Sequence, residues 1–211
     1  VITSAGNPNT WTAKLKTSGS IVMHVVSSVK FAIKAEKSGV DAIVAEGFEA
    51  GGHNGREETT TMVLVPLIKK VIKLPLIAAG GIASGASMLA AMSLGADGVQ
   101  IGSRFVASHE ASSHINFKNA IISAEQGSTI LTLKDLTPVR MMKNKFYEEI
   151  SDLYSTGASS QKISNHLGKG RAKIGMFEGD LDRGELEIGQ VSSQINEIKY
   201  AKEIIDEIID E

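Results

Sequence analysis

Short apolar strands alternate with amphipathic helical segments over the first half of the sequence, and this alternation limits the possible folds more than any other feature. The strand ends recur roughly every 20 to 33 residues, the length of one βα unit. Nearly all strand residues are apolar, as in parallel strands covered on both faces. The pattern predicts a parallel α/β sheet or barrel. The expected strands are Val1–Ser4, Ile21–Val26, Ala42–Glu46, Leu76–Ala79 and Gly98–Ile101.

Two stretches repeat one motif and support repetition of a single unit. KSGVDAIVAEG (Lys37–Gly47) and SLGADGVQIGS (Ser93–Ser103) each carry a glycine, a small or apolar residue, an aspartate and then a strand. The glycine is expected to end the preceding helix in a left-handed cap, from which the chain turns into the next strand. The helices expected between the strands include Val29–Ser38, Met62–Ile72 and Ser87–Leu94.

The pattern changes after residue 107. Residues 1–107 are predicted to form part of a barrel, and residues 108–184 a small helical cap domain with a glycine-rich loop. Within that segment, residues 108–170 have helical spacing and no convincing buried strand. Residues 185–211 end in the amphipathic stretch INEIKYAKEIIDEIID, which predicts a C-terminal helix that returns to the barrel.

Composition argues against several classes of partner. The formal net charge is −2, so the protein is not expected to attract nucleic acid or membrane surfaces. No apolar run approaches the roughly 20 residues that span a bilayer. The sequence has no cysteine, which excludes disulfides and thiolate metal sites and fits a cytoplasmic protein. No spacing of histidine with acidic residues predicts a metal site.

Two glycine motifs follow neighbouring expected strands. IAAGGIASG (Ile77–Gly85) places Gly80 and Gly81 after one strand, and VQIGSRF (Val99–Phe105) places Gly102 and Ser103 after the next. In a parallel barrel, phosphate groups bind where the loops after the last two strands meet exposed backbone N–H groups. The alternative is that these glycines serve only tight βα turns. The motifs do not identify the phosphate compound.

The stretch EGFEAGGHNG (Glu46–Gly55) ends another expected strand and places His53 in a glycine-rich loop. Glycines there let the backbone approach a bulky group closely. His53 is therefore either an exposed loop histidine without a role or a residue that accepts a proton or stabilises a developing negative charge.

The residues resemble the 2-nitropropane dioxygenase-like flavoproteins, which comprise the nitronate monooxygenases and the FMN-dependent enoyl-acyl-carrier-protein reductases. The resemblance extends over essentially the whole chain. The GGI and LGAD parts alone are common among phosphate-binding barrels, but their combination with EAGGHNG is specific. The matching stretches are SAGNP (Ser4–Pro8), DAIVAEGFEAGGHNG (Asp41–Gly55), PLIAAGGIASG (Pro75–Gly85), LGADGVQIGSRF (Leu94–Phe105), SSHINFK (Ser112–Lys118) and FEGDLDRGELEIGQ (Phe177–Gln190).

The resemblance implies a TIM-type (βα)8 barrel with non-covalently bound FMN and a small helical domain. It places His53 beside the flavin as a base or electrostatic partner, and it starts the returning helix at Gln190. Gly51 and Gly52 would pass close to the flavin ring. The implied phosphate ligands are Gly80, Gly81, Gly102 and Ser103.

The family pattern has about three more strands ahead of Val1, so this chain is expected to contain only strands 4–8 of the barrel. Five strands cannot close a barrel and leave an edge exposed. The 211-residue chain is therefore expected to be inactive by itself. The subclass is open at MHVV (Met23–Val26), because one group of nitronate monooxygenases has lysine after the histidine and the enoyl reductases usually have proline in place of His24.

Four alternatives for the function are compatible with these observations. The first is oxidation of alkyl nitronates with O2 by an FMN oxidoreductase. The second is NAD(P)H-dependent reduction of an enoyl thioester carried by acyl carrier protein, with FMN as the hydride carrier. The third is a flavin-free lyase or synthase that binds a phosphosugar on the same glycines, and the fourth is an inactive fragment. A homodimer is compatible with each enzyme.

Overall fold

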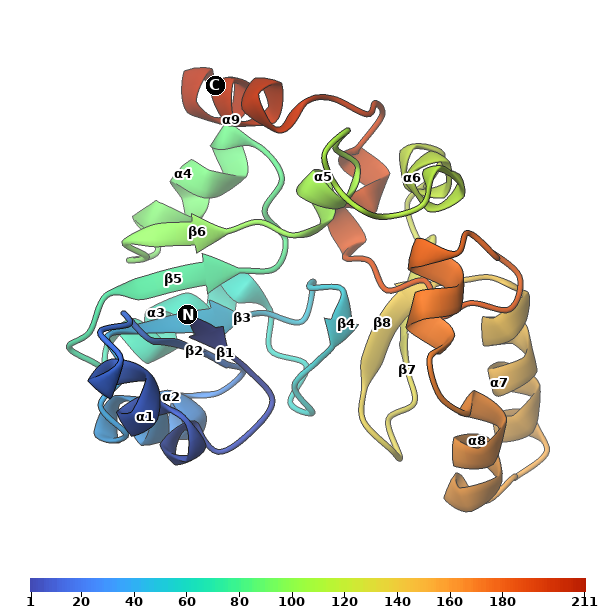
Figure 1. The fold of residues 1–211 in the computed structure, drawn as a ribbon, viewed down its shortest axis with the longest axis horizontal. Helices are drawn as coiled ribbons and strands as arrows, with labels where there is room; N and C mark the ends of the chain where they lie inside the picture. The colour runs from blue at the N-terminus through green and yellow to red at the C-terminus, as the bar shows by residue number, and fades with distance from the viewer. The chain divides into compact units, whose positions relative to one another are not determined.

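The structure is a computed structural model that describes residues 1–211 and consists of two compact units (Figure 1). The first, here called the sheet unit, comprises Val1–Ala50, Asn54–Ile101 and Ile208–Glu211. The second, the hairpin unit, comprises Gly51–His53 and Gly102–Glu207. Each unit has its own sheet and hydrophobic core, and each is described by itself.

The sheet unit is built on a parallel five-stranded sheet with the strand order β1-β2-β3-β5-β6. Every neighbouring pair is parallel. The predicted fold class, an α/β arrangement of the (βα)8-barrel type, is confirmed. The strands are β1 (Ile2–Thr3), β2 (Met23–Val26), β3 (Ala42–Glu46), β5 (Leu76–Ala79) and β6 (Gly98–Gln100).

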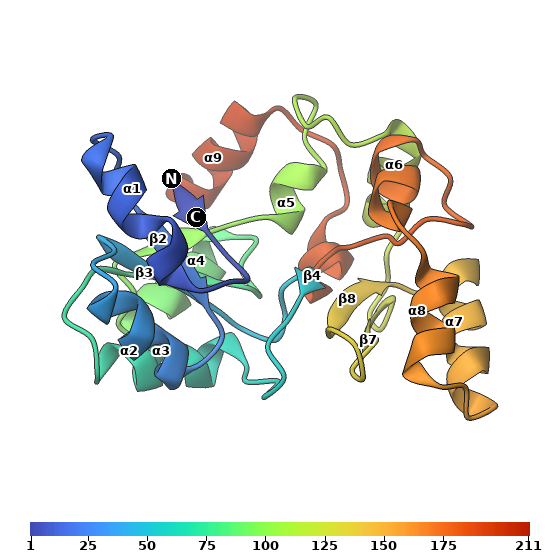
Figure 2. The same ribbon diagram turned by 60° about the horizontal axis from the view of Figure 1, so that its bottom comes forward.

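Helices connect these strands and cover the sheet. Helix α2 packs on β2 and β3, α3 packs on β3 and β5, and α4 packs on β6. Helices α2 and α3 lie side by side (Figure 2). A short helix between β1 and β2, α1, was not expected from the sequence. The helices are α1 (Thr12–Thr17), α2 (Val29–Lys37), α3 (Thr61–Lys69) and α4 (Gly85–Ser93), with a 3-10 turn at Pro8–Thr10.

The repeated glycine–aspartate motif has the same structural role in both copies. Asp41 accepts a hydrogen bond from the backbone N–H of Val22 at 2.8 Å and one from the Lys16 ammonium at 2.6 Å. Asp97 accepts a hydrogen bond from the N–H of Leu76 at 2.9 Å and another from a lysine of α3. Each aspartate thus fixes the start of the preceding strand. The glycines before them, at positions 39 and 95, have φ of +80° and +104°, so the left-handed caps are confirmed.

The hairpin unit corrects the expectation that residues 108–170 contain no buried strand. β7 (Thr129–Thr132) and β8 (Val139–Met142) form an antiparallel pair, and β4 (Gly52–His53) adds to the other edge of β8. His53 therefore lies on a short strand rather than in a free loop. The strands have four residues or fewer, and the buried Arg140 interrupts the apolar run of β8. Such short segments have no recognisable period.

Helices pack on both faces of this hairpin. Phe117 and Ile121 of α6 belong to one apolar cluster, and Phe146 and Ile150 of α7 belong to a second one together with Val139. Helices α7 and α8 lie side by side (Figure 1). The helices of the unit before residue 170 are α5 (Ser103–Val106), α6 (Ile115–Ile122), α7 (Lys145–Ser155) and α8 (Ser160–Leu167).

The last part of the chain contains a π-helical turn at Lys173–Phe177, a 3-10 helix at Gln190–Gln194 and α9 at Ala201–Asp210. Helix α9 buries Ile204 and Ile208, one turn apart, as its amphipathic pattern predicts. None of the helices is long and apolar enough to cross a membrane.

Candidate functional site

Two of the predicted phosphate-binding glycines follow β5 in the sheet unit. The last paired residues of β5 and β6 are Ala79 and Gln100, and because the strands are parallel, their carboxyl ends lie at the same edge of the sheet. Gly80 and Gly81 follow with φ of +88° and +74°, which glycine adopts most readily. Their backbone N–H groups donate no hydrogen bond within the sheet unit, so they can still bind an anion.

Thr61, the first residue of α3, fixes this glycine turn. Its backbone N–H donates to the Glu49 carboxylate at 2.9 Å, and its hydroxyl lies 3.0 Å from Glu49 Oε2 and 2.8 Å from the carbonyl oxygen of Gly80. A carboxylate at a helix N-terminus is favourable because of the helix dipole. The loop that follows β3 is therefore tied to the loop that follows β5.

Two further polar side chains at this edge of the sheet have unusual surroundings. Glu46 ends β3, and burial raises its pKa to about 7. Gln100 ends β6, and its buried Oε1 has no hydrogen-bond partner. A buried carboxyl with a raised pKa and a buried amide oxygen without a donor are typical of functional sites.

The other predicted glycines belong to the hairpin unit. Gly51 packs directly against backbone: a Cβ added there would lie 2.5 Å from the carbonyl carbon of Ile188 and 2.6 Å from the amide nitrogen of Gly189. Gly52 has φ of +76° and pairs with Arg140, while the exposed His53 pairs with Val139. The glycines of this loop are thus required by its contact with the chain around residue 188.

Ser103 contacts the same stretch. Its Oγ accepts a hydrogen bond of 2.9 Å from the backbone N–H of Gly189, which leaves the hydroxyl hydrogen available for another acceptor. The backbone N–H groups of Gly102 and Ser103 donate no hydrogen bond within the hairpin unit. No atom of this unit lies within 4 Å of a Cβ added at Gly102. Free donors and open space are what an anion site requires.

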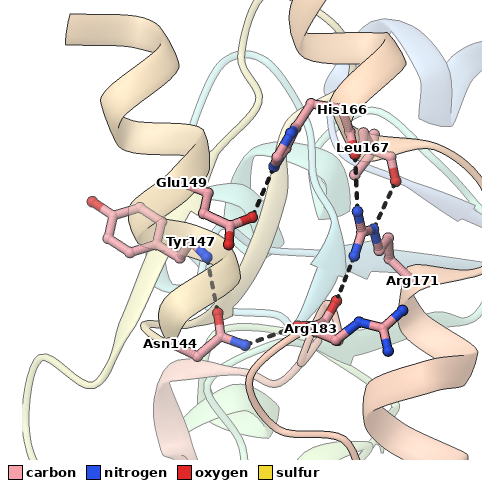
Figure 3. Close-up of polar contacts among 8 residues, drawn as sticks. Asn144, Tyr147, Glu149, His166, Leu167, Arg171 and Arg183 are labelled. Atoms are coloured by element: carbon pink, nitrogen blue, oxygen red, sulfur yellow. Dashed lines mark hydrogen bonds and ion pairs between the residues drawn. The ribbon is translucent and has the colours of Figure 1, made fainter.

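The stretch Glu185–Gly189, here called the 185–189 segment, contacts Gly51 and Ser103 and is itself held at its start. The N–H of Glu185 donates to the carbonyl of Arg171 at 3.1 Å. The Arg171 guanidinium lies over the ring of Phe146, 4.8 Å from the ring centroid. It also donates to backbone carbonyls, including that of Arg183 (Figure 3). Farther along, the segment pairs with β8, because the N–H of Met142 donates to the Leu186 carbonyl at 2.9 Å.

The 185–189 segment carries two carboxyl groups with raised pKa values. Burial, and then the neighbouring Glu187, raise the pKa of Glu185 to about 7, while the positive charge of Arg171 acts in the opposite direction. Burial also raises the pKa of Glu187, and the charge of His53 opposes that increase. Glu187 and His53 therefore interact electrostatically within the hairpin unit.

The structure thus brings four predicted residues, Gly51, Gly52, His53 and Ser103, around the 185–189 segment. Gly80 and Gly81 are in the sheet unit, and Gly102 directly precedes Ser103. The sequence reasoning did not assign roles to Glu46, Gln100 or Glu187. Glu187 lies inside the FEGDLDRGELEIGQ stretch, so its place in that motif was the available signal.

Comparison with known proteins identifies relatives over the whole chain. The family model described as nitronate monooxygenase matches residues 1–211. A probable nitronate monooxygenase from Staphylococcus aureus (strain MSSA476) is 34% identical over 207 residues, which cover 94% of this chain and 58% of the relative. The protein of strain JH9 is 36% identical over 186 residues, which cover 84% of this chain and 52% of the relative. The chain spans about half the length of the curated relatives it matches.

Solved structures give the same picture. FabK from Thermotoga maritima is 39% identical with a TM-score of 0.93, and the match covers 100% of this chain and 66% of that chain. Nitroalkane oxidase from Streptomyces ansochromogenes is 24% identical with a TM-score of 0.82, over 100% of this chain and 63% of that chain. The latter similarity supports the fold alone.

We expect Thr61→Val to destabilise the sheet unit. The substitution keeps the side-chain volume but leaves Gly80 and Glu49 without the hydroxyl donor, which costs about 1–3 kcal/mol of the free energy of unfolding. Urea unfolding measures the loss. Thr60→Val is the matched control, because Thr60 is exposed and makes no side-chain cap. Equal effects of the two substitutions would contradict the role of Thr61.

We expect Glu46→Gln to stabilise the protein at alkaline but not at acidic pH. The folded-state pKa of Glu46, about 7, exceeds the ordinary value of 4.5. Its contribution to stability is therefore complete below pH 4.5 and lost as the pH rises through 7. At pH 8 the substitution should add about 1–3 kcal/mol, and at pH 4.5 little. Urea unfolding at both pH values tests this, with the exposed Glu57→Gln as control. A gain of the same size at both pH values would exclude titration of Glu46 as the cause.

Proposed function

Since the chain belongs to the nitronate monooxygenase family, we propose that the complete protein is an FMN-dependent oxidoreductase that oxidises alkyl nitronates with O2. The observation that carries the proposal is the arrangement of unused backbone donors. Gly80 and Gly81 follow β5, Gly102 and Ser103 follow the neighbouring parallel strand, and none of their N–H groups is used within its own unit. Glycine turns with free backbone donors suit a phosphate monoester.

The residues present fit the FMN phosphate. Gly102 has a negative φ of −103° and open space at its Cβ position, so the structure of the chain itself does not require glycine there. A ligand that approaches the backbone closely would explain this glycine. The Ser103 hydroxyl, which accepts from Gly189, can donate its hydrogen to a phosphate oxygen. We propose that these two residues, with Gly80 and Gly81, hold the phosphate, and that Gly51 and Gly52 lie close to the ring.

In the proposed reaction, bound FMN supplies the redox chemistry between the nitronate and O2. The protein supplies proton transfer and orientation. His53 is exposed on β4, so its ring can reach a substrate, and imidazole accepts protons near neutral pH. With a neutral nitroalkane, the C–H bond would break, the proton would pass to a ring nitrogen of His53, and the electron pair would remain on the substrate as the nitronate.

A second candidate is NAD(P)H-dependent reduction of an enoyl thioester carried by acyl carrier protein. The observation that favours it is the 39% identity to FabK from Thermotoga maritima, compared with 34% and 36% to the two Staphylococcus aureus relatives. In this reaction His53 would polarise or protonate the substrate near the thioester carbonyl. For this reaction we propose NAD(P)H as the reductant and acyl carrier protein as the partner. For either reaction we propose a homodimer in the cytoplasm.

Steady-state turnover separates these two candidates. A nitronate that consumes O2 without added NAD(P)H indicates the first reaction. An enoyl thioester that drives rapid NAD(P)H oxidation indicates the second. A complete protein that is purified without flavin absorption and takes up no FMN would instead favour the flavin-free phosphosugar barrel.

We expect Gly102→Ala to weaken FMN binding without loss of stability. The added methyl group meets no atom of the hairpin unit within 4 Å, and the backbone conformation suits alanine. The methyl group would, however, occupy the place proposed for the phosphate. Fluorescence titration of the apoprotein with FMN measures the dissociation constant, and thermal unfolding of the apoprotein is the control. Unchanged FMN affinity in a stably folded variant would exclude this phosphate site.

We expect His53→Gln to keep FMN but to lose activity on a neutral nitroalkane. Loss of a general base typically costs about 10²–10⁴-fold in rate. Activity on the pre-formed nitronate should fall less, because its proton has already left. Parallel assays on the two substrates, with flavin content as control, measure the difference. Equal losses on both substrates would make His53 a binding residue, and no loss on either would remove it from the mechanism.

A further inference from the structure

The Glu187 carboxyl group lies against the strand that carries His53. A Cβ added at Gly52 would lie 2.6 Å from Glu187 Oε2, so the glycine leaves room for this carboxyl group. Glu187 reaches the place from the 185–189 segment, which is 134 residues farther along the chain. The contact is therefore a product of the fold and not of local sequence.

Strand pairing puts the two side chains on the same face of the hairpin. His53 is opposite Val139 and Glu187 is opposite Met141, both on the edge of β8 that faces away from β7, because Ile130 of β7 already pairs with Met141 on the opposite edge. Side chains two residues apart on a strand point to the same face, and directly paired residues share that face. His53 and Glu187 therefore lie on one face beside the same edge of β8, opposite residues that are two positions apart.

Other charged groups lie on the elements that pack against this pair. Glu185 lies two residues before Glu187, on the same face of its segment, and interacts with Arg171. Arg140 lies between Val139 and Met141 and so points to the opposite face of β8, where it donates to Thr129 Oγ1 at 3.4 Å. Glu187 thus lies on the same face as His53, and the two groups interact electrostatically.

We infer that Glu187 is a positioning residue that stabilises the protonated form of His53 and thereby strengthens it as a proton acceptor. The inference rests on the proton-accepting role of His53 in the proposed function. When a nitroalkane C–H bond breaks and the proton passes to the imidazole, the new positive charge forms beside an existing carboxylate. A partly buried carboxylate stabilises that charge more strongly than an exposed one.

The inference also explains why a buried acidic group is kept on the 185–189 segment. Burial by itself disfavours the Glu187 carboxylate and raises its pKa, and the His53 charge is the interaction that counteracts this increase. Each charge therefore stabilises the other. Removal of either side chain should therefore change the titration of the other, so the inference can be tested at both His53 and Glu187.

The experiment is an NMR titration of the FMN-bound complete protein labelled with ¹³C at the histidine rings, with His53 assigned by His53→Gln. Glu187→Gln should move the midpoint of the His53 titration to lower pH. Glu185→Gln is the matched control, because it removes a buried carboxyl group from the same segment and should move the midpoint less. An unchanged midpoint in Glu187→Gln, or equal shifts in both variants, would overturn the inference.

Two further variants guard against a purely structural effect. Glu187→Asp keeps a carboxylate and should restore the parental midpoint in part, whereas loss of folding alone would give no such rescue. In His53→Gln, the Glu187 carboxyl group, observed with ¹³C-labelled glutamate, should titrate at higher pH because its cationic partner has gone. No change at Glu187 would contradict the reciprocal interaction.

Kinetics supply a readout that separates this inference from the proposed function. In Glu187→Gln, the acidic limb of the kcat/KM profile for a neutral nitroalkane should move to lower pH. The plateau of kcat/KM should also fall, but by less than the loss of about 10²–10⁴-fold that is expected when the base itself is removed. A parent protein that turns over neither nitroalkane nor nitronate would refute the proposed function, while the NMR titrations would still decide whether the pair exists.

Discussion

The direct contact between the backbone of Gly51 and that of Ile188 and Gly189 is the constraint on which the arrangement of the hairpin unit's candidate residues depends. A single methyl group at Gly51 would overlap backbone atoms, and backbone cannot move aside as a flexible side chain can. The contact brings β4 to the edge of β8, places His53 near Glu187 and sets Gly189 within reach of Ser103. The missing side chain of Gly51 thus makes room for the backbone of another segment of the chain.

Buried carboxyl groups form the second theme of the molecule. Glu46, Glu185 and Glu187 all have raised pKa values, and in each case burial is the largest cause. Burial of acidic groups opposes folding at neutral pH, so a fold selected for stability alone would not be expected to keep three of them. Glu46 and Glu185, whose pKa values are raised to about 7, can exchange protons near neutral pH, and such exchange would offset the cost of burying them.

The sequence predicted the sheet unit well and the hairpin unit poorly, for a physical reason. Strands such as Ala42–Glu46 are buried on both faces and follow a glycine–aspartate turn. Their apolar composition and the turn before them therefore both indicate a strand. β8 is equally buried, but it is short and carries Arg140, and its pairing with β4 depends on residues far away in the chain. The glycine turns and His53 could be named from motifs. The proximity of Glu187 could not, because only the fold creates it.

The aspartates that begin β3 and β6 have a consequence for how the protein is made. Asp41 binds the N–H of Val22, and Asp97 binds that of Leu76, so each contact spans 19 or 21 residues. Contacts of such short range close quickly, and each involves only chain that has already left the ribosome when the aspartate emerges. Synthesis at about 5–20 residues per second gives each new βα segment time to dock onto the strand made before it. The sheet can therefore form in the direction of translation, with each aspartate fixing the strand that was synthesised before it.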